Sequence, residues 1–232
     1  MIEIIRAKDR HFADHGWLKA NWLFSFGDYF DEDNVQFGAL RVYNDDVVAA
    51  GEGFPPHPHR EMEIVTLVFE GELTHQDSMG TKATVRPGEV QTMSAGTGIT
   101  HSEFNLGTKP VHLHQIWLVP GTSRLKPSYD QKRFQPNEWE NRLFPVASGQ
   151  NIPDAAVIHT DATIYRASLD AGHSINFDRT KGRRIFVYLV NGSLEVNGQV
   201  VQANDQARAD IDVPLVLKAK ADAEFILIDV AA

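Results

Sequence analysis

Two short segments of the chain each carry a pair of side chains that can bind a metal ion. His57 and His59 are separated by one residue, and so are His101 and Glu103. On a β-strand, residues two apart point to the same face about 7 Å from each other, and neighbouring strands lie roughly 4.8 Å apart. If the two segments are neighbouring strands, all four side chains can point at one centre. We therefore expect a metal site formed by His57, His59, His101 and Glu103.

The types of these ligands indicate which ions suit the site. Three imidazole nitrogens and one carboxylate oxygen favour first-row divalent ions such as Fe, Co, Ni, Cu or Zn, and leave positions open for a substrate or dioxygen. A single His-x-His on a strand is more often a half-buried, hydrogen-bonded pair, but the second pair favours the metal site. The chain has no cysteine, which excludes thiolate metal sites, disulfides and cysteine nucleophiles.

Short runs of β-branched and aromatic residues, broken by Gly, Pro and Asp, surround these pairs from Phe37 to Pro120. A second series of the same kind runs from Ile164 to Val230. This spacing of strands and turns predicts a β-sandwich or β-barrel in each half. The segment between them reads as a linker with a short helical turn near Pro136–Arg142. We expect a metal-binding barrel over residues 1–120, a linker over 121–153 and a second barrel over 154–232.

The two halves also share a local pattern. Ile64–Leu73 aligns with Ile185–Leu194, and each is an apolar strand that ends in a glycine, Gly71 or Gly192, and then restarts. The match is short, and strand–glycine–strand patterns are common in all-β chains. It nevertheless favours an internal duplication of one fold.

Composition narrows the class of protein. The 232 residues are 42% hydrophobic and 23% charged, which excludes disordered and low-complexity chains. The net charge is −9, and the basic cluster Lys181–Arg184 stands alone, so direct nucleic-acid binding is not expected. Charges in Met1–Arg10 do not fit a signal peptide, and no apolar run approaches the ~20 residues that span a bilayer. We expect a cytoplasmic protein without a membrane partner.

The two ligand segments resemble the two sequence motifs of the cupin superfamily, whose members are small β-barrels with a metal inside. The matching residues are Gly51, His57, His59, Glu63, Gly71, Gly98, His101 and Asn105. One position departs from the pattern, because the glutamate ligand of the first motif would fall on Ile64. A shift of one residue turns a strand side chain to the other face, so we do not expect Glu63 to bind the metal.

Longer strings of the first half resemble the pirin family of bicupins. These strings are Phe24–Asp31, His57–Glu63, Glu70–Ser78, Met93–Glu103 and Gln115–Leu118. The resemblance implies an all-β bicupin, with two tandem cupin barrels (double-stranded β-helix or jelly roll) that face each other. It also implies one divalent metal ion in the N-terminal barrel, held by His57, His59, His101 and Glu103. Fe(II) is the expected ion, and Cu, Ni, Co, Mn or Zn are the alternatives.

In pirins the C-terminal barrel has lost its metal, and the residues of this chain agree. The alignment of the two halves places Asp178 and Thr180 opposite His57 and His59, and no His-x-His follows His114. We therefore expect the second barrel to be structural.

Other side chains of the first half have weaker claims to a role. His75 and Asp77 form a pair that either orients a ligand or substrate or is simply a polar strand end. His112 and His114 form a third His-x-His, which we assign to a supporting or core position and not to the metal. The candidates for lining the pocket mouth are Phe24, Phe26 and Met93, although apolar residues in such a chain are more often plain core.

The resemblance to pirins implies an enzyme. Bacterial pirins are associated with cleavage of the flavonol quercetin at its 2,3 bond, and Glu103 is a candidate base for the flavonol 3-hydroxyl because it is both ligand and carboxylate. We expect a metal-dependent quercetin 2,3-dioxygenase-like oxidoreductase. Its partners would be dioxygen and a flavonol, or a related small enol or aromatic substrate.

Two other functions were weighed against the enzyme. The main alternative is a metal- or redox-dependent regulatory protein that binds a protein partner, because eukaryotic pirins resemble transcription cofactors. An accessible pocket at the metal favours the enzyme, whereas a sealed site beside a charged patch favours the regulator. A metal-dependent sugar isomerase ranks last, since only Arg60 offers a charge for phosphate nearby.

Overall fold

The computed structural model describes residues 2–178, 182–210 and 214–232. The chain forms two compact units. One, the first barrel, comprises His11–Phe134 and Ala147–Asp161. The other, the second barrel, comprises Met1–Arg10, Gln135–Val146 and Ala162–Ala232. Each barrel therefore collects segments that are distant in the sequence.

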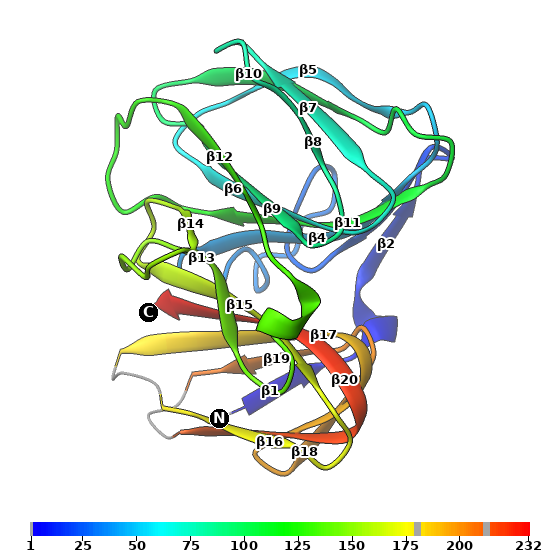
Figure 1. Cartoon of the computed structure of the whole chain (residues 1–232), viewed down its shortest axis with the longest axis vertical. Coiled ribbons are helices and arrows are strands. Elements are labelled where there is room, and N and C mark those ends of the chain that lie inside the picture. Colours follow the sequence, from blue (N-terminus) through cyan, green and yellow to red (C-terminus); the bar gives the residue numbers. More distant parts are fainter. Residues whose placement is uncertain (1, 179–181, 211–213) are drawn as a thin grey trace. The chain divides into compact units, whose positions relative to one another are not determined.

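The first barrel consists of two antiparallel sheets whose strands all lie in the described part of the chain. A seven-stranded sheet has the order β12-β9-β6-β11-β4-β3-β2, and a four-stranded sheet has the order β5-β10-β7-β8. Within this unit the two sheets face each other (Figure 1). The strands of these two sheets are β2 (His11–Asp14), β3 (Leu18–Trp22), β4 (Leu40–Val48), β5 (Gly53–His59), β6 (Glu63–Glu70), β7 (Leu73–Asp77), β8 (Lys82–Val85), β9 (Glu89–Ser94), β10 (Ile99–Phe104), β11 (Val111–Leu118) and β12 (Ser128–Arg133). The short β14 (Ala156–Val157) falls in the same unit but belongs to neither sheet, because it pairs parallel with β13 (Phe144–Ser148).

Side chains from both sheets fill the space between them. Leu73 and Val85 of the four-stranded sheet pack in one cluster with Val48, Val111 and Leu113 of the seven-stranded sheet. Because strand side chains alternate between faces, this cluster identifies the inner face of β4 and β11. Every second residue of β4 and β11, in step with Val48, Val111 and Leu113, therefore points into the barrel.

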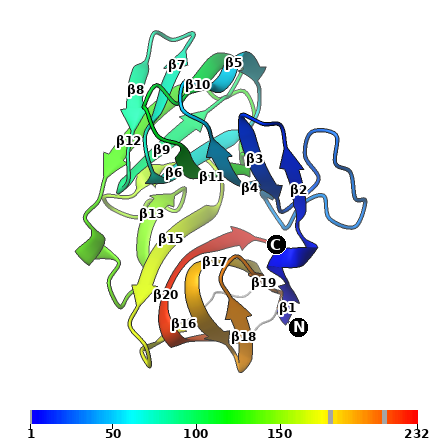
Figure 2. The same cartoon turned by 90° about the vertical axis from the view of Figure 1, so that its right-hand side faces the viewer.

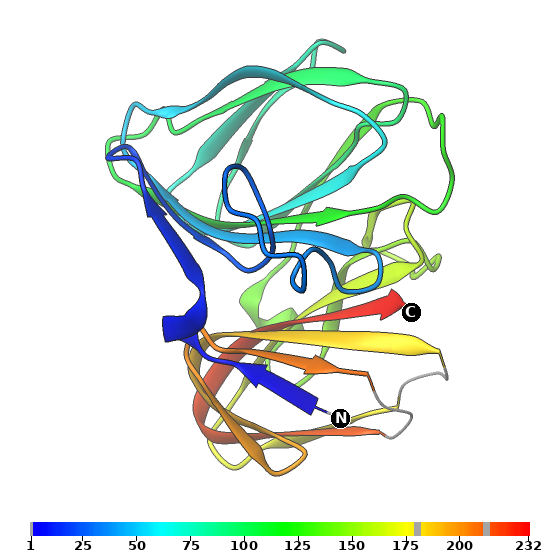
Figure 3. The ribbon, with the colours of Figure 1, turned by 180° about the vertical axis from the view of Figure 1, so that it is seen from behind.

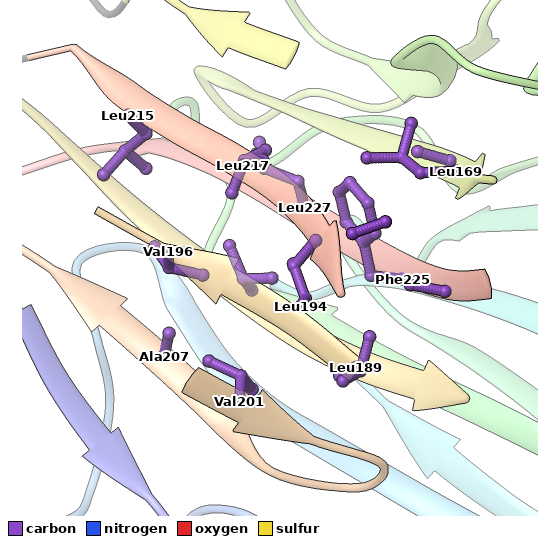
Figure 4. Close-up of a cluster of buried hydrophobic side chains, with 14 of the residues drawn as sticks. Leu169, Leu189, Leu194, Val196, Val201, Ala207, Leu215, Leu217, Phe225 and Leu227 are labelled. Carbon is purple, nitrogen blue, oxygen red and sulfur yellow. The ribbon is translucent and has the colours of Figure 1, made fainter. Parts of the chain in front are cut away.

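The second barrel is built around two long strands, β17 (Arg183–Val196) and β20 (Leu215–Ala231). Its strand order is β1-β19-β17-β20-β15, with β16 on β20 and β18 on β17. The remaining strands are β1 (Ile2–Ile5), β13 (Phe144–Ser148), β15 (Ala162–Leu169), β16 (Ser174–Phe177), β18 (Gln199–Gln202) and β19 (Gln206–Ala209). Leucine and valine side chains of β17, β18 and β20 point into the space between these strands and, with Phe225, form the core of this barrel (Figure 4).

The first strand of the chain belongs to the second barrel. β1 pairs antiparallel with β19, from Ile2 opposite Ala209 to Ile5 opposite Gln206 (Figure 3). The domain boundaries predicted along the sequence, 1–120, 121–153 and 154–232, stay a prediction. The compact units show that the first ten residues lie with the later part of the chain.

Gly71 and Gly192, the glycines that align the two halves, have the same backbone role. Gly71 has φ 74° and Gly192 has φ 85°, a region that favours glycine. A Cβ on Gly71 would lie 2.7 Å from the Pro110 carbonyl oxygen, and one on Gly192 would collide with the Asp222 carbonyl. Each glycine thus permits close approach of a neighbouring strand, which supports the predicted internal duplication.

The segment predicted as a linker contains more structure than expected. A 3-10 turn over Pro136–Glu138 occupies the predicted helical region, and the other described helical segment is a 3-10 turn over Ala7–Asp9. β12 and β13 also lie in this segment. β12 is a polar strand at the edge of its sheet, and its sequence has no apolar alternation by which to recognise it. No helix in the described ranges is long and apolar enough to cross a membrane.

Candidate metal centre

The two predicted ligand pairs lie on neighbouring strands of the four-stranded sheet. β5 and β10 lie side by side (Figure 2) and are antiparallel. In their register, His101 stands directly opposite His57. A register shift between His101 and Glu103 displaces the carboxylate along the strand, so that Glu103 pairs with Phe54. The turn at Gly96 and Gly98 precedes β10, and both glycines have positive φ.

Three histidine rings converge at this point. The ring centroids of His57 and His59 are 4.8 Å apart, those of His57 and His101 are 4.5 Å apart, and those of His59 and His101 are 4.9 Å apart. Each ring offers one nitrogen, and these three nitrogens lie within 4.8 Å of one another. His101 is buried, whereas His57 and His59 are half-buried. Three nitrogens at this separation can share one ion after small side-chain adjustments.

The hydrogen bonds leave these nitrogens free to bind an ion. Nδ1–H of His57 donates to the Pro55 carbonyl at 2.7 Å, which leaves Nε2 as the lone-pair nitrogen. Nε2 of His59 and Nε2 of His101 are buried and have no hydrogen-bond partner among the described residues. Burial of an unsatisfied nitrogen is costly, and a coordinated ion would remove that cost. The three residues therefore fit a divalent cation.

The local environment keeps two of the rings neutral. Burial, with the neighbouring imidazoles His101 and His57, lowers the pKa of His59 to about 4. Burial, followed by the proximity of His57 and His75, lowers the pKa of His101 to about 3. Neutral imidazole is the form that binds metals, so both rings are ready to coordinate at neutral pH.

Glu103 is held beside the histidines by two amides. Its Oε1 accepts a hydrogen bond from Gln91 Nε2 at 3.2 Å, and its Oε2 accepts one from Gln115 Nε2 at 2.7 Å. The carboxylate belongs to a second group of possible ligands, with His75 and His101. His101 is common to both groups, which places Glu103 next to the three-histidine cluster as a candidate oxygen ligand.

His75 and Asp77 form a chain of hydrogen bonds that ends on His101. His75 Nε2 lies 3.1 Å from Asp77 Oδ2, and His75 Nδ1 lies 3.3 Å from His101 Nδ1. The carboxylate accepts from Nε2–H of His75, so His75 Nδ1 is the acceptor and His101 Nδ1–H the donor. This assignment leaves the Nε2 lone pair of His101 facing the metal site. The sequence leaves two roles open for His75 and Asp77, a polar strand end or a pair that orients a ligand. This geometry supports the second role.

The pKa of Asp77 agrees with that arrangement. Burial raises it, but hydrogen bonds from His75 and from the Thr81 and Met79 backbone outweigh burial and lower the pKa below its usual value. Asp77 is therefore ionised at neutral pH, as an acceptor for His75 must be.

The third His-x-His points to the opposite face of β11. Gln115 and Trp117 lie on the other face of β11, toward the candidate metal site. Gln115 donates to Glu103, and Trp117 Nε1 donates to Gln115 Oε1 at 3.0 Å. His112 Nε2 instead lies 2.8 Å from Asp45 Oδ1, and His114 Nδ1 lies 2.8 Å from the Tyr43 hydroxyl. The structure thus separates this pair from the three-histidine cluster.

The Glu63 carboxylate is held by groups outside the three-histidine cluster. Its Oε1 accepts a hydrogen bond from Ser94 Oγ at 2.6 Å, and its Oε2 accepts one from the His159 backbone N–H at 2.9 Å. This placement agrees with the prediction from the one-residue shift at Ile64.

A pocket of about 330 Å³ adjoins the three-histidine cluster. It is lined by Leu18, Trp22, Phe26, Asn44, Asp46, Phe54, Pro55, His57, His59, Glu103, Gln115 and Trp117. Of the three candidates for lining the pocket mouth, Phe26 lies in this lining. Phe24 and Met93, the other two candidates, are fully buried and do not line it, and Met93 packs with Ile64, Ala95 and Ile99.

Four polar residues of the site were missed by sequence reasoning. They are Asn44, Asp46, Gln91 and Gln115. Burial, followed by the charges of Asp45 and Glu103, raises the pKa of Asp46 well above its usual value. The sequence signal for such residues is a polar residue at the buried position of an otherwise apolar strand.

The second barrel differs from the first in its potential metal ligands. Within the described ranges, all the groups of His, Asp and Glu that could hold an ion lie in the first barrel. Asp178, one of the residues aligned with the ligand histidines, is exposed beyond the end of β16. Thr180, the other one, lies outside the described residues.

Two barrels of this kind in one chain, one of them with a histidine cluster inside, define a bicupin. The family model described as pirin matches residues 5–118, and the model described as quercetinase C-terminal cupin domain matches residues 145–230. The chain belongs to the pirin family. It is 42% identical to the pirin-like protein of Caulobacter vibrioides, over 94% of this chain and 95% of that one.

Other relatives link the chain to named enzymes and to a metal complex. It is 39% identical to the quercetin 2,3-dioxygenase of Escherichia coli K12, over 99% of this chain and 98% of that one. The crystal structure of bacterial pirin YhhW from Escherichia coli with nickel(II) matches with a TM-score of 0.94 and 38% identity, over 100% and 99% of the two chains. The predictions of an all-β bicupin and of a quercetin 2,3-dioxygenase-like protein are confirmed.

Proposed function

We propose that the protein is a metal-dependent dioxygenase that cleaves a flavonol such as quercetin at its 2,3 bond, or a related small enol or aromatic substrate. The observation that carries this proposal is the convergence of three metal-competent histidines beside an aromatic pocket. The similarity to a named quercetin 2,3-dioxygenase over nearly the whole chain supports the choice of substrate. We propose dioxygen and this small molecule as partners, and the cytoplasm as location.

His57, His59 and His101 would hold the ion through their Nε2 or equivalent ring nitrogens, and Glu103 would add a carboxylate oxygen. When bound, the ion, Fe(II) in our proposal, supplies electronic coupling between an electron-rich substrate and dioxygen. The hydrogen bonds to Pro55 and His75 orient two of the rings before any ion enters. Such preorganisation limits the side-chain movement that binding requires.

Glu103 is the base that we propose for the flavonol 3-hydroxyl. Its carboxylate lines the pocket, so a hydroxyl placed beside the histidines comes within its reach. The amides of Gln91 and Gln115 fix both of its oxygens, and Gln115 is itself held by Trp117. Proton transfer to Glu103 would convert the flavonol to its more electron-rich anion.

The pocket walls suit a flat aromatic molecule. The Phe26 ring contacts two indoles in edge-to-face geometry. Its centroid lies 5.5 Å from that of Trp22 and 5.3 Å from that of Trp117. Aromatic walls offer both apolar burial and favourable ring contacts to a planar substrate. Because this pocket adjoins the candidate ligands directly, the geometry favours catalysis over the regulatory alternative, for which we expected a sealed site.

The experiment that tests the proposed function is oxygen uptake by the metal-analysed protein, reconstituted with Fe(II) or Cu(II), when quercetin is added. We expect uptake that follows metal occupancy and disappears in His57→Ala. His112→Ala is the matched control, because His112 also belongs to a His-x-His but lies on the other face of β11. A fully metal-loaded protein that consumes no oxygen with quercetin or other flavonols would overturn the proposal.

A further inference from the structure

Two polar side chains stand on the pocket wall that faces the candidate ligands. Asn44 and Asp46 alternate with Asp45 on β4, in the seven-stranded sheet, whereas the histidines lie on the four-stranded sheet. Asn44 stands between Gln115 and Trp22 on the neighbouring strands. This register puts both residues on the inner face of the barrel.

The surroundings of Asp46 are apolar on both sides. Its register partners are Leu113 on β11 and Ala20 on β3, and both are buried. A carboxyl group between such neighbours has no obvious structural purpose. Its position on the pocket lining, in contrast, makes it available to a bound molecule.

Both side chains carry a buried oxygen without a donor. Asn44 is 3% exposed and Asp46 is 3% exposed. Oδ1 of Asn44 and Oδ1 of Asp46 have no hydrogen-bond partner among the described residues. Buried acceptors are nearly always satisfied, so a pair of unsatisfied ones beside a pocket indicates a donor supplied by a ligand or by ordered water.

The rest of the pocket restricts what that donor can be. Trp22, Phe26, Phe54 and Trp117 supply aromatic surface, and the lining contains no lysine or arginine from the described part of the chain. Burial favours the protonated form of the Asp46 carboxyl, which both donates and accepts a hydrogen bond. A neutral hydroxyl on a flat ring satisfies these groups, whereas an anionic substituent beside Asn44 and Asp46 would have no basic side chain of the described lining to pair with.

We infer that Asn44 and Asp46 form a hydroxyl-binding subsite, which selects aromatic substrates that carry a phenolic hydroxyl on the ring that lies against this wall of the pocket. This inference rests on the proposed function for its choice of substrate. The two side chains are specificity-determining residues: they hold the ring that carries this hydroxyl while the reacting atoms lie at the histidines.

The test compares two flavonols that share the 3-hydroxyl, one with hydroxyls on the pendant ring and one without. Binding to the metal-loaded protein is measured without oxygen, by quenching of the fluorescence of Trp22 and Trp117, which line the pocket. We expect the hydroxylated flavonol to bind about threefold to tenfold more tightly for each hydrogen bond that it makes. Asn44→Leu and Asp46→Leu should weaken binding of the hydroxylated flavonol much more than binding of the other one, and so reduce this preference.

Two further variants separate recognition from a structural effect. Asp46→Asn keeps a donor and an acceptor in place, so we expect it to retain most of the preference. Asp45→Asn makes the same chemical change on the outer face of the same strand and should leave the preference unchanged. In turnover experiments with the hydroxylated flavonol, the leucine variants should raise KM more than they lower kcat.

The outcomes distinguish this inference from the proposed function. Equal affinity of the unaltered protein for the two flavonols, or a preference that survives in both leucine variants, overturns the subsite even if oxygen uptake persists. A preference that is lost in the leucine variants supports the subsite even if no oxygen is consumed. Absence of binding by both flavonols overturns the subsite as well.

Discussion

Hydrogen bonds around single residues decide which ring nitrogen of His57 and of His101 faces the candidate metal site. The Pro55 carbonyl accepts from Nδ1–H of His57, and the chain from Asp77 through His75 makes Nδ1–H of His101 a donor. In both rings the Nε2 lone pair remains for an ion. The Asp77 carboxylate, acting through His75, thus sets the tautomer of the candidate ligand His101.

Replacement of Asp77 tests that chain. In Asp77→Asn, the side-chain amide must face either His75 Nε2–H or the backbone N–H groups of Met79 and Thr81, which are all donors. We expect the affinity for Fe(II) or Ni(II) to fall about 10- to 100-fold. Calorimetric titration measures the affinity, and circular dichroism checks the fold. An unchanged affinity in a folded variant would show that Asp77 does not orient the ligand.

The low pKa values of His59 and His101 predict how the metal-free protein responds to acid. Both rings stay neutral in the folded state down to about pH 4 and 3, but protonate near pH 6.5 when unfolded. The unfolded state then binds more protons, so stability falls as pH drops from about 6.5 toward 4. Urea unfolding at several pH values measures how the free energy of unfolding depends on pH. In His101→Gln we expect a weaker dependence, by an amount that corresponds to the uptake of up to about one proton. An equal dependence in both proteins would contradict the pKa of His101.

The candidate metal ligands illustrate what sequence alone can provide. His57, His59, His101 and Glu103 could be predicted because ligands two apart on a strand leave a visible spacing. Asn44, Asp46, Gln91 and Gln115 could not, because a single polar residue within an apolar strand does not reveal its face or its partner. Only the register of β4 against β11 shows that Asn44 lies opposite Gln115.

At the scale of elements, turns and strand faces position the site. The turn after β6 brings Gly71 against Pro110, just before β11, and β11 in turn carries Gln115 to Glu103. The glycine of this turn was recognised in the sequence, whereas β12 was missed because its side chains are polar. Strand period therefore identifies half-buried strands well and polar edge strands poorly.

The close approach at Gly71 gives a prediction about stability. In Gly71→Ala, the new Cβ adds a steric conflict with the Pro110 carbonyl to the strain of φ 74°. Gly80→Ala is the matched control, since its φ is 92° and nothing lies within 4 Å of the new Cβ. We expect Gly80→Ala to cost about 1–2 kcal/mol and Gly71→Ala clearly more. Chemical denaturation measures both, and equal costs would show that the turn relaxes freely.

At the scale of the whole molecule, chain order and spatial grouping differ. β1 completes the sheet of the second barrel, where Ile2 and Ile4 pack against its core, although about two hundred residues separate them from β19. No local pattern in the sequence reports such a pairing. The predicted all-β class and the doubling of the fold depend on local strand patterns, which is why they were accessible.

Asp205 attaches this first strand to the second barrel. Its buried carboxylate accepts hydrogen bonds from the Ala7 backbone N–H at 2.7 Å and from Arg6 at 2.7 Å, and also from the Gln202 backbone N–H at 3.0 Å. Asp205→Ala leaves these donors unsatisfied, and we expect the free energy of unfolding to fall by about 1–3 kcal/mol. The exposed Asp210, which pairs with Arg184, is the control, and Asp210→Ala should change stability by less than about 0.5 kcal/mol.

The Asp205→Ala variant also tests whether the second barrel contributes to metal binding. Because every candidate ligand lies in the first barrel, Asp205→Ala should bind Fe(II) or Ni(II) with the same stoichiometry as the unaltered protein. His101→Ala should show the reverse, with lost metal and a retained fold. Metal analysis alongside urea unfolding distinguishes the two variants. Loss of metal in a folded Asp205→Ala protein would mean that the second barrel determines the geometry of the metal site, in addition to its structural role.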